Sequence, residues 1–180
     1  MVTRKIPERL VWVATTLAVE PGDHLLEIGC GRGPAVSLIC ETLEDGSITA
    51  IDRSAVAIRA AEQANIDHVR AGKARFLHAE LADVELDQHF DTVFAVNMNL
   101  FWLRAATREL AIIEQLLTPA APGGALHLFY GYGKPGAGRS DVVHRLASGL
   151  TAAGYTVDDV VEPSPGSSHM LYVRARPRST

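Results

Sequence analysis

The stretch that most constrains the fold is a short apolar run leading directly into a glycine-rich turn at residues 29–33. Residues 25–28 are apolar apart from Glu27, and Pro34 follows the last glycine of the turn. Glycine lacks a Cβ, so this turn can adopt positive φ angles and let a ligand approach the backbone closely. Proline is favoured in the first turn of a helix, whose free N–H groups suit a polar ligand. The stretch therefore predicts a buried strand, a nucleotide-cofactor turn and a helix.

The spacing of the glycines separates two classes of cofactor. Dinucleotide-binding turns have the pattern G-x-G-x-x-G, and this chain carries Pro34 where the third glycine would stand. Its glycines instead follow the pattern G-x-G-x-G, with the acidic residue Glu27 two positions ahead. This pattern resembles motif I of the class I S-adenosylmethionine-dependent methyltransferases. The resemblance extends from the N-terminal helix to the last strand and implies that family's fold and cofactor.

Apolar strand-like runs alternate with amphipathic helical segments along most of the chain, as is typical of a parallel sheet covered by helices on both faces. Expected helices are at 7–19, 34–43, 55–64, 107–117 and 140–153, and expected strands at 24–28, 48–51, 74–79, 90–96, 125–130, 155–161 and 170–175. The last two strands are joined by too few residues for a crossover helix, so they pair antiparallel. With the resemblance, this predicts an α/β fold: a three-layer Rossmann-like sandwich whose mostly parallel seven-stranded sheet has one antiparallel strand near the C-terminus.

Length and composition favour one cytoplasmic domain. A chain of 180 residues suits a single methyltransferase domain, with an N-terminal helix at about 7–19 and a core at about 23–176. The net charge of −4 and the scattered basic residues argue against a nucleic-acid-binding face. Cys30 and Cys40 lack metal or redox spacing, and no apolar run is long enough to span a bilayer. The oligomeric state stays open between monomer and homodimer.

Side chains at the carboxyl ends of the strands form the candidate cofactor site, because ligands of open parallel sheets bind there. Asp52 ends the second strand, where its carboxylate can accept hydrogen bonds from two ribose hydroxyls. The resemblance implies that Glu27 holds the amino end of the cofactor and that Glu80 contacts the adenine, with Asp83 as an alternative. The predicted cofactor-binding residues are Glu27, Gly29, Cys30, Gly31, Gly33, Asp52, Arg53, Glu80, Leu81 and Asn97.

The cofactor implied by this set is S-adenosyl-L-methionine, with S-adenosyl-L-homocysteine as its product, and no metal is expected. The predicted acceptor pocket consists of Asn99, Phe101, Trp102, Tyr130 and Tyr132, although Phe101 and Trp102 suit a core equally well. His169 is the candidate general base, because the start of an antiparallel last strand lies at the carboxyl edge of the others. A surface or hydrogen-bonded role is the alternative for His169. The glycine-rich segment 131–138 is either a lid or a surface loop.

The sequence thus predicts methyl transfer to a small-molecule acceptor by in-line displacement at the sulfonium methyl. The protein's main task in such a reaction is to align the nucleophile. Two alternatives stay open: methylation of RNA or protein, which requires a positively charged face, and a cofactor-binding protein without transfer. A nicotinamide oxidoreductase fits least, because of Pro34.

Overall fold

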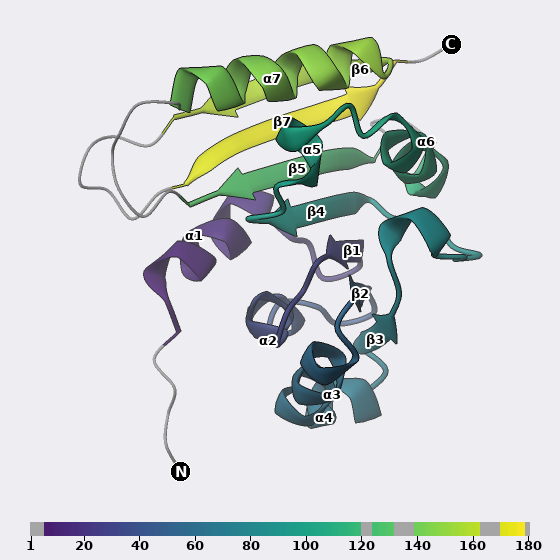
Figure 1. Ribbon diagram of the computed structural model, residues 1–180. Coiled ribbons are helices and arrows are strands. Elements are labelled where there is room, and N and C mark those ends of the chain that lie inside the picture. The colour runs from purple at the N-terminus through teal and green to yellow at the C-terminus, as the bar shows by residue number, and fades with distance from the viewer. Residues whose placement is uncertain (1–5, 120–123, 132–138, 163–169, 179–180) are drawn as a thin grey trace.

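One seven-stranded sheet organises the computed structural model, which describes residues 6–119, 124–131, 139–162 and 170–178. The strands are β1 (His24–Ile28), β2 (Ser47–Asp52), β3 (Ala74–His78), β4 (Thr92–Val96), β5 (Ala125–Tyr130), β6 (Tyr155–Val161) and β7 (Leu171–Pro177). Their order is β3-β2-β1-β4-β5-β7-β6, and β7 alone runs against both of its neighbours (Figure 1). The predicted mostly parallel sheet with one reversed strand is therefore confirmed.

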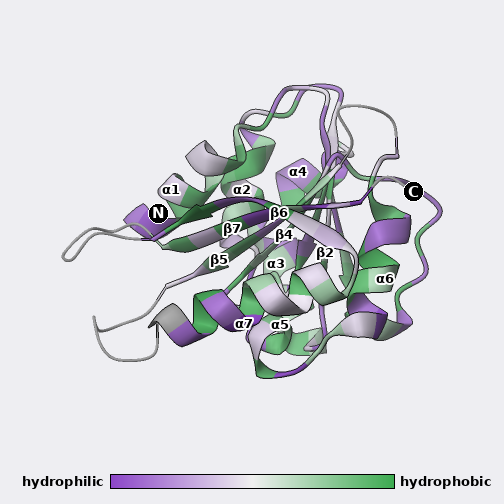
Figure 2. Cartoon of the chain, turned by 90° about the horizontal axis from the view of Figure 1, so that it is seen from above, coloured by the Kyte–Doolittle hydropathy of each residue, from purple (hydrophilic) through white to green (hydrophobic). Residues whose placement is uncertain are grey.

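Helices cover both faces of this sheet, so that three layers are visible when the molecule is turned (Figure 2). One face carries α1 (Glu8–Leu17), α2 (Pro34–Cys40), α3 (Ala55–Ala64) and α4 (Ile66–Arg70). The other carries α5 (Leu100–Leu103), α6 (Thr107–Leu116) and α7 (Arg139–Ala152). Successive side chains of a strand point to opposite faces, and β1 accordingly supplies Leu25 to one core and Leu26 and Ile28 to the other.

The structure contains short helices that the sequence pattern did not predict. The Ser54 hydroxyl caps α3 by accepting a hydrogen bond from the Ala57 N–H at 3.2 Å, as the residue type favours. The helices α4 and α5 and the 3₁₀ turn η1 (Leu81–Asp83) were not predicted. None of the three exceeds five residues, so none has the hydrophobic periodicity by which a helix is recognised. Among the described helices, none combines the length and apolarity needed to cross a membrane.

An aromatic cluster lies between α1 and the C-terminal half of the sheet. The Trp12 ring of α1 meets the rings of Phe129 and Tyr172 edge-on, at centroid distances of 5.8 and 6.4 Å. The Tyr172 hydroxyl is hydrogen-bonded to Nδ1 of His127 at 3.0 Å. His127 is only 6% exposed, and its burial, aided by the charge of Arg174, lowers the pKa of its imidazole to about 4. The neutral ring is therefore the form that the fold stabilises.

The pKa of His127 predicts a loss of stability in mild acid. Because this pKa lies below the value of about 6.5 in the unfolded chain, protons bind the unfolded state more readily. The stabilisation is complete above pH 6.5 and is lost as the pH falls towards 4, at up to about 1.4 kcal/mol per pH unit. Urea unfolding of the wild type and of His127→Gln between pH 5 and 7 measures this contribution as the difference between the two slopes of stability against pH. The wild type should gain more stability per pH unit than His127→Gln, and equal slopes in the two proteins would contradict the assignment.

Candidate functional site

The glycine turn between β1 and α2 has the backbone conformation that its sequence predicts. Gly29, Gly31 and Gly33 have φ angles of +76°, +56° and +71°. The N–H groups of Gly29 and Cys30 donate to the Ile51 carbonyl at 2.8 and 3.0 Å, which fastens the turn to the end of β2. A side chain at these φ angles would strain the backbone, so the turn requires glycine on conformational grounds.

Gly33 has a second role, in packing the turn against α3. A Cβ at Gly33 would lie 2.8 Å from Nδ2 of Asn65 and 3.1 Å from Cβ of Ala61. Asn65 is 1% exposed and donates to the carbonyls of Gly33 and Ala61 at 3.2 and 2.9 Å. Its Oδ1 accepts from the Ser37 hydroxyl at 2.6 Å. Asn65 was missed by the sequence analysis, because nothing in a lone asparagine between two helices indicates what it contacts.

Asp52 is fixed at the carboxyl end of β2 by two backbone hydrogen bonds. Its Oδ2 accepts from the Gly31 N–H at 2.9 Å, and its Oδ1 accepts from the Ser54 N–H at 2.8 Å. A carboxylate has about four acceptor positions, so each oxygen keeps capacity for a ligand hydroxyl. The side chain is thus held in one orientation while its acceptors remain available, as binding of a ribose diol requires.

Glu27 provides a buried carboxyl group behind the glycine turn. Its side chain is 3% exposed, and its Oε2 has no hydrogen-bond partner among the described residues. Burial, with a smaller contribution from the charge of Asp52, raises the pKa of this carboxyl to about 8. A buried acceptor without a donor is rare and points to a missing partner. A cationic donor such as an ammonium group would satisfy Oε2 and stabilise the charged form of Glu27.

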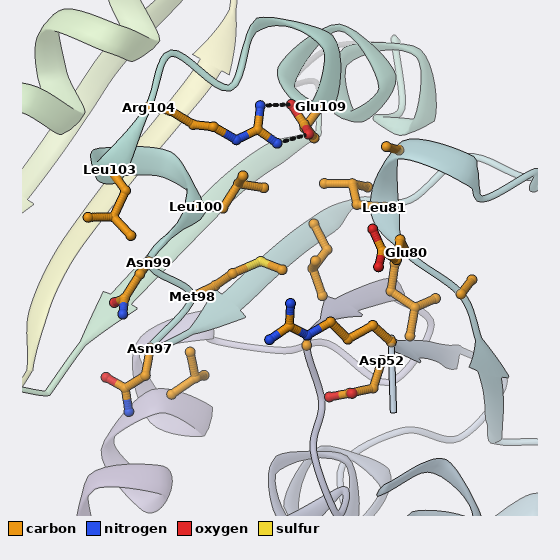
Figure 3. Close-up of a pocket in the computed structure, with 17 residues that line it drawn as sticks. Asp52, Glu80, Leu81, Asn97, Met98, Asn99, Leu100, Leu103, Arg104 and Glu109 are labelled. Atoms are coloured by element: carbon orange, nitrogen blue, oxygen red, sulfur yellow. Dashed lines mark hydrogen bonds and ion pairs between the residues drawn. The ribbon is translucent and has the colours of Figure 1, made fainter. Parts of the chain in front are cut away.

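A cavity of about 590 Å³ opens beside the carboxyl ends of β1, β2 and β4 (Figure 3). Its volume is in the range of small-molecule and cofactor pockets. Seven of the predicted site residues line it: Gly29, Asp52, Arg53, Glu80, Leu81, Asn97 and Asn99. Asn97 has a φ of +57°, and its Oδ1 accepts from the Gly131 N–H at 2.7 Å. The strand ends therefore converge on one cavity, as expected for this type of sheet.

The other predicted site residues lie elsewhere. Glu27, Cys30, Gly31 and Gly33 shape or back the turn and do not line the cavity. Three aromatic residues that were predicted for the acceptor pocket pack into the core instead: Phe101, Trp102 and Tyr130. The Tyr130 hydroxyl donates to the Met98 carbonyl at 2.8 Å, and α5 packs against α7. Tyr132, His169 and most of segment 131–138 are outside the described residues.

Several cavity residues were not predicted, and most belong to α5 and its neighbours. They include Met98, Leu100, Leu103, Arg104 and Glu109. Figure 3 shows Arg104 and Glu109 joined by two contacts, with Nη2–Oε1 at 2.5 Å and Nη1–Oε2 at 3.5 Å. Sequence reasoning had no signal for this pair, because its two members flank a break between two helices. Among the described residues, no group of three His, Cys, Asp or Glu side chains is placed to hold a metal ion.

Comparison with known proteins identifies the family. A family model for a methyltransferase domain matches residues 25–124, which include the glycine turn, Asp52 and the ends of β3 and β4. An O-methyltransferase of Pyrenophora dematioidea is 30% identical over 110 residues, which cover 61% of this chain and 40% of that protein. The chain thus spans about two fifths of the length of the curated relatives that head this comparison.

Solved structures agree on the fold. A SAM-dependent methyltransferase of Aquifex aeolicus superposes with a TM-score of 0.72 at 20% identity, over 92% of this chain and 88% of that one. The glycopeptide N-methyltransferase MtfA superposes with a TM-score of 0.74 at 16% identity, over 98% of this chain and 92% of that one. With the matched domain, the glycine turn and the reversed β7, these results establish that the chain belongs to the class I S-adenosylmethionine-dependent methyltransferase family.

Proposed function

We propose that this protein transfers a methyl group from S-adenosylmethionine to a small-molecule acceptor, by in-line displacement at the sulfonium methyl. The observation that carries this proposal is the carboxylate of Asp52, which two backbone N–H groups hold at the wall of a cavity beside the glycine turn. When bound, S-adenosylmethionine supplies a methyl group activated by the positive charge on sulfur. No metal and no covalent intermediate on the protein is needed for such a displacement.

Different residues at the strand ends bind different parts of S-adenosylmethionine. In this proposal Asp52 accepts from the ribose hydroxyls, and Glu27 accepts from the amino group. Glu80 and the backbone of Leu81 contact the adenine, beside Arg53, and Asn97 borders the methionine part. This assignment follows the cavity lining at the ends of successive strands, together with the unpaired Oε2 behind the turn.

The acceptor is then held at the end of the cavity formed by Met98, Asn99 and α5. The protein lowers the barrier chiefly by alignment, which can contribute roughly 7–11 kcal/mol in favourable cases. A small-molecule acceptor is supported by the volume of the cavity and by the similarity to an O-methyltransferase. His169 remains the candidate general base and Tyr132 a candidate pocket residue.

Two measurements test the function in sequence. Isothermal titration with S-adenosylmethionine, S-adenosylhomocysteine and NAD should show binding of the two sulfur compounds alone. Transfer of label from methyl-tritiated cofactor is then followed into a metabolite extract, total RNA and total protein, and we expect label in the metabolites. Label in RNA or protein would reassign the acceptor. Cofactor binding with no transfer to any fraction would favour a cofactor-binding protein.

A further inference from the structure

The end of the cavity next to α5 differs in character from the cofactor end. Its apolar walls come from Met98, Leu100 and Leu103. Leu103 is 61% exposed, which is unusual for a large aliphatic side chain, and it lies at the cavity with Leu100 and Arg104 around it (Figure 3). An exposed leucine on a cavity wall gains free energy when an apolar ligand covers it. This end therefore suits the hydrocarbon part of an acceptor.

Arg104 places one oriented cation beside these apolar walls. Its guanidinium is held by Glu109, whose side chain is only 6% exposed, whereas the Arg104 side chain is 59% exposed. A carboxylate buried to this degree needs its partner, so the pair is maintained and the guanidinium stays in place. Glu109 is the only hydrogen-bond partner that Arg104 has among the described residues.

The hydrogen-bonding capacity of Arg104 is only partly used in this pair. A guanidinium carries five N–H donors, and Glu109 is within hydrogen-bond distance of Nη1 and Nη2 only. The edge formed by Nε and Nη2 thus retains donors in a planar, parallel arrangement. Such an edge matches the two oxygens of a carboxylate. Because Glu109 already orients the guanidinium, a carboxylate binds it with a smaller loss of side-chain entropy than it would bind a freely rotating arginine.

We propose that the acceptor is an apolar molecule that carries a carboxylate. In this inference, which rests on the proposed function, the carboxylate binds the free edge of Arg104 and the hydrocarbon part packs on Leu100 and Leu103. The acceptor is anchored at its acidic end, and its remainder extends towards Gly29 and Asp52 at the cofactor end of the same cavity. If the pair only fastened α5 to α6, ligand choice would not depend on Arg104.

Matched ligands test this site directly. Protein saturated with S-adenosylhomocysteine is titrated calorimetrically with hexanoate, octanoate and decanoate, each compared with its primary amide. Amides keep the shape and chain length but remove the negative charge. We expect the best carboxylate to bind at least tenfold more tightly than its amide.

Two variants and one control isolate the contribution of Arg104. Arg104→Met combined with Glu109→Leu removes both charges, so no buried carboxylate is left unpaired, and it should abolish the preference for carboxylates. Arg104→Lys keeps the charge but lacks the planar fork, and it should lose most of the preference. Arg108→Met is the control, because Arg108 is 70% exposed, pairs with Asp83 and does not line the cavity. It should behave as the wild type.

The outcomes separate the two proposals. Equal binding of acids and amides, or a preference that survives in the double variant, would overturn the carboxylate site. Failure of S-adenosylhomocysteine to bind would contradict the proposed function instead. In that case the same titrations of the unliganded protein still measure whether a carboxylate preference depends on Arg104.

Discussion

Replacement of Asp52 by alanine is expected to weaken the binding of S-adenosylmethionine by about 10- to 150-fold. Loss of the hydrogen bonds to a charged group typically costs roughly 1.5–3 kcal/mol in total, which corresponds to this range. The loss should be at the lower end if one ribose hydroxyl depends on the carboxylate, and at the upper end if both do. Calorimetric titration of the purified variant with the cofactor measures the change.

The control for this experiment is Asp45→Ala. Asp45 is exposed and precedes the amino end of β2, so it lies at the opposite edge of the sheet from Asp52. Asp52 also accepts from the N–H groups of Gly31 and Ser54, so thermal unfolding must show that the variant remains folded. Unchanged affinity in a folded Asp52→Ala protein would remove Asp52 from the cofactor site.

The second large effect concerns pH. We expect the affinity for S-adenosylmethionine to rise by up to tenfold per pH unit between pH 6 and 8, because in the proposed binding mode Glu27 must be ionised to accept from the cofactor's ammonium group. The pKa of Glu27 is raised to about 8 in the unliganded protein, so most of these side chains are protonated at pH 7. Binding of a cation beside Oε2 lowers this pKa and expels the proton. Affinity is therefore lost as the pH falls through 8.

Calorimetry in buffers of different ionisation enthalpy measures this proton directly. At pH 7, binding should release up to about 0.9 proton per cofactor, as a group with a pKa near 8 requires. The neighbouring Cys30 thiol does not interfere, because burial raises its pKa far above this window. Glu27→Gln should bind more weakly at pH 8 and show no pH dependence between 6 and 8. A pH dependence that persists in Glu27→Gln would assign the proton to another group.

The cofactor half of the site could be predicted from the sequence because it depends on strand ends. Once β1 and β2 are placed by their apolar runs, parallel pairing brings the glycine turn and Asp52 together. The geometry of the turn confirms this reasoning through the positive φ angles and the hydrogen bond from the Gly31 N–H to Asp52.

The acceptor half could not be predicted in the same way. Every residue of β5 is buried, so alternation along the strand does not reveal that Tyr130 faces the core. The helix α5 is a single turn, and its orientation depends on how it packs against α7. The Arg104–Glu109 pair is five residues apart across a break between helices, and this spacing predicts no contact.

The contact between Gly33 and Asn65 makes the cofactor turn dependent on a part of the chain that no cofactor would touch. Asn65 both ends α3 and begins α4. Its side-chain amide therefore connects the junction of these helices to the turn, through hydrogen bonds with the Ser37 hydroxyl and the Gly33 carbonyl. The residue types at positions 33, 37 and 65 therefore depend on one another. A redesign of cofactor preference that replaces Gly33 alone would push a Cβ against the Asn65 amide and disturb a buried hydrogen-bond network, so the three positions have to change together.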